Sequence, residues 1–322
     1  MQAESLKEKY QPYFKIGAAI NPRDIEHRGE IIKKHFNSIT CDNAMKFSSL
    51  TRKPGEFFTE PADKVVAFAK ENGMVMHGHT FVWHNQTPDF IFENTTSEQL
   101  LESLRNHVRR FKEHFGEFAT FDAVNEAIED KSEAYLRDTK WKAILGDNYI
   151  PQVFRVIKDV LPNTALYYND YNECNPVKRE KIVRLLKELL AEGAPISGMG
   201  MQFHCGMFRP EIDEMKRSIE AYAALGLTLR VSEMDVSLYK GDHEAQLPAP
   251  DAERLKMQAD YYEQCFKVFR EYHTHIDAVT LWGVADDATW LNNFPVIGRK
   301  NWPLLFDDNH EPKEAFYRIM NF

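Results

Sequence analysis

Two glutamates each close a short apolar run of this sequence, and they are the residues best suited to chemistry. Glu126 ends the run Phe121-Asp-Ala-Val-Asn-Glu126, and Glu233 ends Leu229-Arg-Val-Ser-Glu233. Such runs are typical of buried strands, where an unpaired carboxylate is costly. Two carboxyl groups that meet at one site can divide the acid and nucleophile roles of glycosidic bond cleavage. The rest of the chain must therefore bring them together.

Strand-like and helix-like segments alternate along the whole sequence. We predict strands at residues 14–18, 36–40, 75–79, 121–125, 165–168, 198–202, 227–231 and 278–282. Amphipathic stretches predict helices over residues 61–71, 97–115, 141–160, 176–192, 210–225 and 251–272. This alternation is typical of the α/β class and of a closed (β/α)₈ TIM barrel, whose active site lies at the carboxyl ends of the strands. Because no linker or repeat divides the sequence, residues 1–322 are predicted to form a single catalytic domain.

Composition excludes several classes of protein. Hydrophobic residues make up 43% and charged residues 28% of the chain, as in an ordinary soluble globular protein. A net charge of -9 argues against a nucleic-acid partner, because neutralising phosphates requires clustered lysine and arginine. No stretch approaches the ~20 apolar residues that span a membrane. Residues 1–30 carry no secretory signal, and the four scattered cysteines favour reduced thiols, so we expect a cytoplasmic protein.

Polar and aromatic residues follow the predicted strands. Because the strand ends of a barrel converge on one face, these side chains are predicted to share a site. Aromatic planes can stack on sugar rings, and amide, imidazole and ammonium groups match sugar hydroxyls. His77 and His79 lie on one strand face without further ligands at metal-site spacing, so we expect no metal. The candidates are Asp42, Asn43, Lys46, His79, Trp83, Asn125, Tyr171, Asn172, Gln202, His204, Asp235, Trp282 and Trp290.

Seven motifs resemble, in order, those of the glycoside hydrolase family 10 endo-β-1,4-xylanases. They are Thr40-Cys-Asp-Asn-Ala-Met-Lys46, His77-Gly-His-Thr-Phe-Val-Trp83-His84, Asp122-Ala-Val-Asn-Glu126, Tyr168-Asn-Asp-Tyr171-Asn172, Gly198-Met-Gly-Met-Gln202-Phe-His204, Ser232-Glu233-Met-Asp235-Val-Ser237 and Trp282-Gly-Val-Ala-Asp286. The resemblance implies the TIM barrel, the hydrolysis of β-1,4 bonds in xylan fragments and xylo-oligosaccharides, and no cofactor. The chain is similar to the intracellular branch of the family, whose members work on imported xylo-oligosaccharides.

The resemblance also implies a role for each matching position. Glu126 is expected to be the general acid/base and Glu233 the nucleophile, with Asn125 at the sugar 2-hydroxyl. His204 and Asp235 are expected to support Glu233. The other matches are expected to bind sugar: Asn43, Lys46, His79, Trp83, Gln202, Trp282 and Trp290 on the glycone side, and Tyr171 and Asn172 on the aglycone side. Carboxyl groups ~5 to 5.5 Å apart would give a retaining double displacement.

Three positions depart from the family pattern. Asp42 and Ala44 stand where glutamate is usual, and Phe121 stands where tryptophan is usual. The shorter Asp42 side chain is expected to lengthen its hydrogen bond to a glycone hydroxyl or to route that bond through water. The charge-rich residues 129–138, next to Glu126, are expected to shape the aglycone side.

Other functions share parts of this pattern. An exo-acting β-xylosidase or another retaining barrel β-glycosidase could use the same pair of glutamates, because fold alone does not fix substrate. A non-catalytic xylan-binding protein would keep the aromatic residues but gain little from a desolvated acid pair. A metal-dependent hydrolase would need His77 and His79 to act with further ligands, and its turnover would be lost to a chelator.

Overall fold

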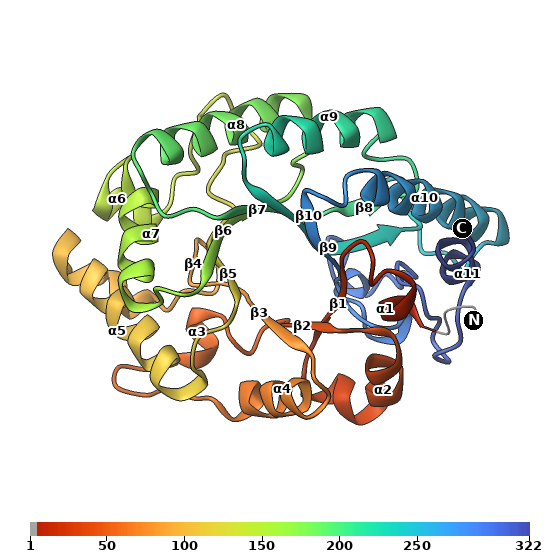
Figure 1. Cartoon of the computed structure of the whole chain (residues 1–322), viewed down its shortest axis with the longest axis horizontal. Coiled ribbons are helices and arrows are strands. Elements are labelled where there is room, and N and C mark those ends of the chain that lie inside the picture. The colour runs from red at the N-terminus through yellow and green to blue at the C-terminus, as the bar shows by residue number, and fades with distance from the viewer. Residues whose placement is uncertain (1–4) are drawn as a thin grey trace.

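The strands of the computed structural model, which describes residues 5–322, form one closed parallel barrel (Figure 1). They run in the order β10, β1, β2, β3, β5, β6, β7 and β9, and β9 pairs again with β10. Short strands β4 and β8 pair with β5 and β9. The predicted TIM barrel is confirmed, and each predicted strand overlaps an observed one. The strands are β1 (Lys15–Ile20), β2 (Ser38–Cys41), β3 (Val75–Gly78), β4 (Val82–Trp83), β5 (Thr120–Asn125), β6 (Ala165–Asp170), β7 (Gly198–Met201), β8 (His204–Gly206), β9 (Thr228–Ser237) and β10 (Ile276–Leu281).

Helices surround the barrel and cover the outer faces of its strands (Figure 1). Helix α5 illustrates why they form: Thr96 and Gln99 make a capping box at its start, and its apolar face buries Leu100, Leu104 and Phe111. No helix within residues 5–322 is long and apolar enough to cross a membrane. The helices are α1 (Leu6–Lys9), α2 (Pro22–His35), α3 (Phe47–Leu50), α4 (Glu60–Glu71), α5 (Ser97–Phe115), α6 (Lys140–Leu145), α7 (Tyr149–Val160), α8 (Pro176–Ala191), α9 (Ile212–Ala223), α10 (Ala252–Glu271) and α11 (Glu314–Met320).

Several helices differ from the sequence prediction. The helix predicted over residues 141–160 is divided into α6 and α7, because Gly146 takes a φ of 84° and ends α6. The prediction also omitted the short helices α1, α3 and α11 and the longer α2. The start of α2 carries recognisable signals, since Asn21 caps the helix together with Asp24 and Pro22 is its first residue.

Phe121, one of the departures from the family pattern, is a core residue. Its ring is fully buried and stacks on Phe81 with the ring centroids 3.8 Å apart. A Cβ atom on Gly78 would lie 2.0 Å from this ring, so only glycine permits the close approach of β3 to β5. The presence of Phe121 in place of the usual tryptophan therefore affects the packing of the core. It leaves the polar groups at the strand ends unchanged.

Candidate active site

The two glutamates lie at the same end of the barrel. Glu126 directly follows β5, and Glu233 lies on β9 with its main-chain N–H donating to the carbonyl of Gln202, just after β7. Glu126 is half-buried, whereas Glu233 is 5% exposed. Parallel strands deliver their carboxyl ends to one face, which explains why residues so distant in sequence meet there.

Three amide side chains, those of Gln202, Asn125 and Asn169, join the carboxyl groups. Gln202 Nε2 donates to Glu126 Oε1 at 3.1 Å and to Asn125 Oδ1 at 3.2 Å. Asn169 Nδ2 donates to the same Asn125 oxygen at 3.0 Å and to Glu233 Oε1 at 2.7 Å. Glu126 and Glu233 therefore belong to one continuous hydrogen-bond network.

Asn169 is a member of this network to which the sequence assigned no role. It is fully buried at the end of β6, and Ser232 Oγ donates to its Oδ1 at 2.7 Å. A Cβ atom on Gly200 would lie 2.2 Å from that oxygen, so the glycine provides the space that Asn169 occupies. Its place at a strand end was the available signal, but an asparagine there is also common as a structural residue.

Glu233 is held in its ionised form. Burial alone would raise its pKa, but the nearby His79, the hydrogen bond and charge of His204, and the Asn169 amide together lower it. His204 Nε2 lies 3.3 Å from Glu233 Oε2, and its Nδ1 lies 3.1 Å from Asp235 Oδ2. Burial disfavours a charged imidazole, yet the Asp235 and Glu233 carboxylates outweigh it and raise the pKa of His204 to about 10.

His204 is consequently an imidazolium at neutral pH. Each of its ring N–H groups donates a hydrogen bond to a carboxylate, one on Glu233 and one on Asp235. Asp235 orients it and also accepts a hydrogen bond from Trp290 Nε1 at 2.7 Å. The structure thus brings His204, Asp235 and Trp290 together beside Glu233. This arrangement suits a carboxylate that must attack as an anion.

Glu126 has different surroundings. Trp83 Nε1 donates to its Oε2 at 2.9 Å, and Asn125 Nδ2 donates to its Oε1 at 3.2 Å. The sequence predicted Trp83 as a wall for sugar stacking; the structure adds this direct bond to the carboxyl group. Glu126 also has a φ of 56°, a left-handed conformation that is uncommon for a residue with a side chain.

The remaining glycone-side candidates gather around His79. Its Nδ1 lies 2.8 Å from Asp122 Oδ2 and 4.0 Å from Glu233 Oε1. Trp282 meets the His79 ring edge to face, with centroids 5.5 Å apart. Lys46 is buried, and its ammonium group lies 4.9 Å from the Trp83 ring centroid.

Two candidates extend this group outward. Asn43 is exposed and accepts a hydrogen bond from Lys46 Nζ at 3.0 Å. Asp42 lines a cavity of about 480 Å³ that also reaches Trp290. Burial raises the pKa of Asp42 despite the nearby Lys46 and His79. The expected weakening of glycone binding by Asp42 stays a prediction.

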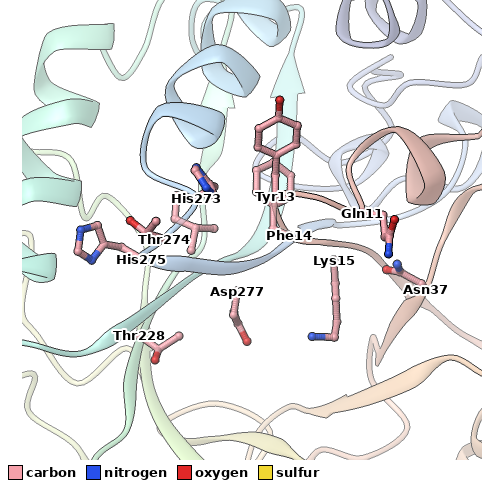
Figure 2. A pocket seen from close by; sticks show the side chains of 11 residues that line it. Gln11, Tyr13, Phe14, Lys15, Asn37, Thr228, His273, Thr274, His275 and Asp277 are labelled. Atoms are coloured by element: carbon pink, nitrogen blue, oxygen red, sulfur yellow. The ribbon is translucent and has the colours of Figure 1, made fainter. Parts of the chain in front are cut away.

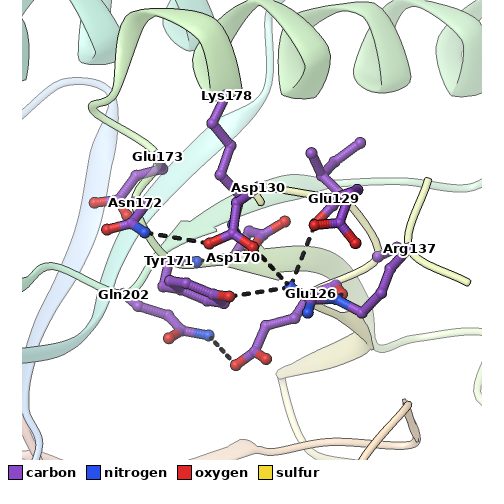
Figure 3. A network of polar contacts seen from close by, with 12 residues as sticks. Glu126, Glu129, Asp130, Arg137, Asp170, Tyr171, Asn172, Glu173, Lys178 and Gln202 are labelled. Carbon is purple, nitrogen blue, oxygen red and sulfur yellow. Dashed lines mark hydrogen bonds and ion pairs between the residues drawn. The ribbon is translucent and has the colours of Figure 1, made fainter. Parts of the chain in front are cut away.

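Tyr171 and Asn172 lie close to Glu126 (Figure 3). Both follow β6, Tyr171 half-buried and Asn172 exposed. Figure 3 shows them beside residues of the 129–138 segment: Asn172 Nδ2 donates to Asp130 Oδ2 at 3.3 Å, and Arg137 donates to the Tyr171 hydroxyl at 3.0 Å. The twelve predicted binding residues and the supporting Asp235 therefore lie around the strand ends near the two glutamates.

A second cavity, of about 520 Å³, lies at the opposite mouth of the barrel (Figure 2). Its lining residues Lys15, Thr228 and Asp277 stand at the beginnings of β1, β9 and β10. Asp277 forms an ion pair with Arg230, whose Nε donates to it at 3.1 Å. This cavity is thus separate from the paired glutamates. In the part of the chain that the structure describes, no three histidine, cysteine or carboxylate side chains form a group that could hold a metal ion.

His204→Ala should shift the pH dependence of any activity that needs ionised Glu233. The His204 imidazolium lowers the pKa of Glu233 through a hydrogen bond and a positive charge. Its removal should therefore raise the pKa of Glu233. Because activity falls as pH drops through that pKa, we expect the acid limb of kcat/KM to move up by ~1 unit or more. The profile should be measured on an aryl β-xylobioside with a good leaving group. His243→Ala, at an exposed histidine, should leave the limb in place; an unchanged limb in His204→Ala would contradict the assignment.

Comparison with known proteins identifies the family. The sequence model of glycosyl hydrolase family 10 matches residues 5–322. The chain belongs to glycosyl hydrolase family 10. The resemblance carried by the seven motifs is thereby confirmed, and the chain is a glycoside hydrolase.

Individual relatives of this family 10 chain are similar over almost their whole length. Endo-1,4-β-xylanase B of Paenibacillus barcinonensis is 46% identical, over 98% of this chain and 97% of its own. The endo-1,4-β-xylanase of Geobacillus stearothermophilus is 43% identical, over 98% of both.

Solved structures agree with the fold. The endo-1,4-β-xylanase from Caldicellulosiruptor owensensis superposes with a TM-score of 0.96 at 47% identity and covers 99% of both chains. A further structure, that of a variant in complex with xylotriose, has a TM-score of 0.96 at 45% identity, again over 99% of both chains. These similarities support the barrel observed here.

Proposed function

We propose that this chain is a retaining endo-1,4-β-xylanase that cleaves xylan fragments and xylo-oligosaccharides. The observation that carries the proposal is that one hydrogen-bond network connects Glu126 and Glu233 in a family 10 barrel, with Glu233 held in its ionised form. Similar members of that family are named endo-1,4-β-xylanases, and one similar structure contains xylotriose. The substrate follows from these relatives and the reaction class from the two carboxyl groups.

In the proposed mechanism the two glutamates take different roles because their surroundings differ. Glu233, an anion against the His204 imidazolium, attacks the anomeric carbon and forms a covalent glycosyl-enzyme. Glu126 protonates the departing glycosidic oxygen in the same step. It then takes a proton from the water that hydrolyses the glycosyl-enzyme, which restores both carboxyl groups.

The binding residues divide around that point of cleavage. His79, Lys46, Trp83, Trp282 and Trp290 would hold the glycone through hydrogen bonds and ring stacking. Asn125 and Gln202, which already connect the carboxyl groups, would meet the sugar nearest the cleaved bond. On the leaving side Tyr171 and Asn172 would contact the aglycone.

The alternative functions receive less support. A non-catalytic xylan-binding protein has no use for a buried carboxylate held by an imidazolium. An exo-acting β-xylosidase would share the two glutamates, and product analysis separates it from an endo-acting enzyme. We also propose a cytoplasmic location, supported by four buried, unpaired cysteines; fractionation of the source cells would test it.

A time course on linear xylo-oligosaccharides of increasing length tests the proposed function. The purified protein should cut internal bonds of xylotetraose and longer chains, releasing xylobiose and xylotriose early. Carboxymethyl cellulose should be inert. Xylose released one unit at a time would replace the endo-acting proposal with the exo-acting one, and chelator-sensitive turnover would contradict the metal-free mechanism.

A further inference from the structure

Arg137, in the charge-rich segment after Glu126, contacts both the candidate acid and the aglycone-side tyrosine (Figure 3). Its Nε donates to the main-chain carbonyl of Glu126 at 3.1 Å. Its Nη2 donates to the Tyr171 hydroxyl at 3.0 Å. The Arg137 side chain is only 15% exposed, so both bonds are largely shielded from water. One planar guanidinium therefore links two residues that come from different strands.

The bond to Glu126 supports an unusual backbone conformation. Glu126, with its φ of 56°, needs its surroundings to hold it in the left-handed region. Its N–H donates to the Asn169 carbonyl at 2.9 Å, and Arg137 binds the carbonyl on its other side. The main-chain N–H of Arg137 donates to the carbonyl of Ala127 at 2.8 Å, which ties the arginine to the same turn. The direction of the Glu126 carboxyl group depends on this turn.

The bond to Tyr171 fixes a ring that is already held from one side. The Lys178 ammonium lies 3.7 Å from the Tyr171 ring centroid and donates to Asp170 at 2.7 Å. Burial raises the pKa of the Tyr171 phenol, although the Arg137 hydrogen bond opposes this, so the phenol is neutral at working pH. With one face against Lys178 and its hydroxyl bound to Arg137, the ring has little freedom of its own.

A carboxylate completes the charge balance around Arg137. Asp130 Oδ1 lies 3.5 Å from Arg137 Nη2, and Asp130 Oδ2 accepts from Asn172. Burial would raise the pKa of Asp130, but Lys178, Tyr171 and Arg137 together lower it and keep it ionised. The guanidinium is thus paired within the segment, and it also donates to the main-chain carbonyls of Glu126 and Ile128 and to the Tyr171 hydroxyl.

We propose that Arg137 is a positioning residue that couples the aglycone wall at Tyr171 to the main chain of Glu126, and so places the Glu126 carboxyl group on the leaving oxygen. The inference rests on the proposed function, in which Glu126 is the acid. A misplacement of about 1 Å can cost on the order of 10²-fold in rate, so a residue without substrate contact can matter at this level. The effect should appear only where the leaving group needs a proton.

Arg137→Met tests this, because methionine keeps part of the side-chain volume but removes every donor. The measurement is kcat/KM on two aryl β-xylobiosides, one with a phenyl and one with a 2,4-dinitrophenyl leaving group. We expect a loss of ~100-fold on the phenyl substrate, which needs protonation, and less than ~3-fold on the dinitrophenyl substrate, which does not. Arg105→Met, at a partly exposed arginine on α5, is the matched control and should change neither value.

Two further variants keep the test decisive should Arg137→Met fold poorly. Arg137→Lys retains the charge but cannot donate to the Glu126 carbonyl and the Tyr171 hydroxyl in the planar geometry of a guanidinium. It should show a smaller loss with the same leaving-group dependence. Tyr171→Phe removes the shared hydroxyl; combined with Arg137→Met, it should add nothing on the phenyl substrate. An equal loss on both substrates, or no loss on either, overturns the inference. Wild-type protein inactive on both substrates would instead refute the proposed function.

Discussion

Glu233→Ala should lower kcat on xylo-oligosaccharides by on the order of 10⁵-fold, as expected when a covalent nucleophile is removed from a group of residues that act as a unit. The carboxylate that this change deletes is buried, is held by His204 and Asn169, and has a lowered pKa. Asp235, the acid joined to Glu233 through His204, is itself engaged by His204 and Trp290, so it is not free to replace the lost carboxylate.

Added azide distinguishes the nucleophile from other essential residues. In Glu233→Ala the small anion can occupy the vacated space and attack the anomeric carbon, giving a glycosyl azide of inverted configuration. Glu263→Ala, at an ion-paired glutamate on α10, should retain full activity. Activity of Glu233→Ala within tenfold of wild type would remove Glu233 from the mechanism, provided that circular dichroism shows a folded protein.

Glu126→Ala should have an effect that depends on the leaving group. On xylo-oligosaccharides, whose leaving oxygen must be protonated, we expect kcat/KM to fall by ~10² to 10⁴-fold. On 2,4-dinitrophenyl β-xylobioside the first step needs no acid, so kcat/KM should change little. The second step then becomes slow, because the base that activates water is missing.

Azide provides the matching check for Glu126. It needs no general base, so it should accelerate the second step of Glu126→Ala and yield a glycosyl azide of retained configuration. The two variants thus differ in the configuration of their azide products, although both lie in one hydrogen-bond network. A uniform loss on both substrates would show that Glu126 acts by binding and not as the acid.

The barrel and the convergence of the candidate residues at one of its ends were largely predictable from the sequence. Parallel buried strands appear as continuous apolar runs, and polar residues that follow them, such as Lys46, Glu126 and Gln202, must converge because the barrel closes. The glutamates were recognisable because their position at strand ends conflicts with burial. The break between α6 and α7 was less accessible, because the amphipathic pattern continues past Gly146 and only its backbone conformation ends the helix.

Contacts made across the site could not be predicted. The sequence shows Arg137 only as one charge among many in residues 129–138. Its role depends on how that segment folds back over Glu126, where Lys181 Nζ binds the carbonyls of Glu129, Ser132 and Ala134. The bond from Trp83 to Glu126 and the bridge through Asn169 likewise follow from side-chain directions that spacing alone does not fix.

The configuration of the first product tests the central claim most directly. The claim is that ionised Glu233 attacks the anomeric carbon while Glu126 protonates the leaving oxygen and then activates water at the same carbon. Proton NMR during the first minutes of xylopentaose hydrolysis should show the β-anomer of the new reducing end before mutarotation produces the α-anomer. Initial accumulation of the α-anomer would mean that water attacks directly, and the account of the two glutamates would be wrong.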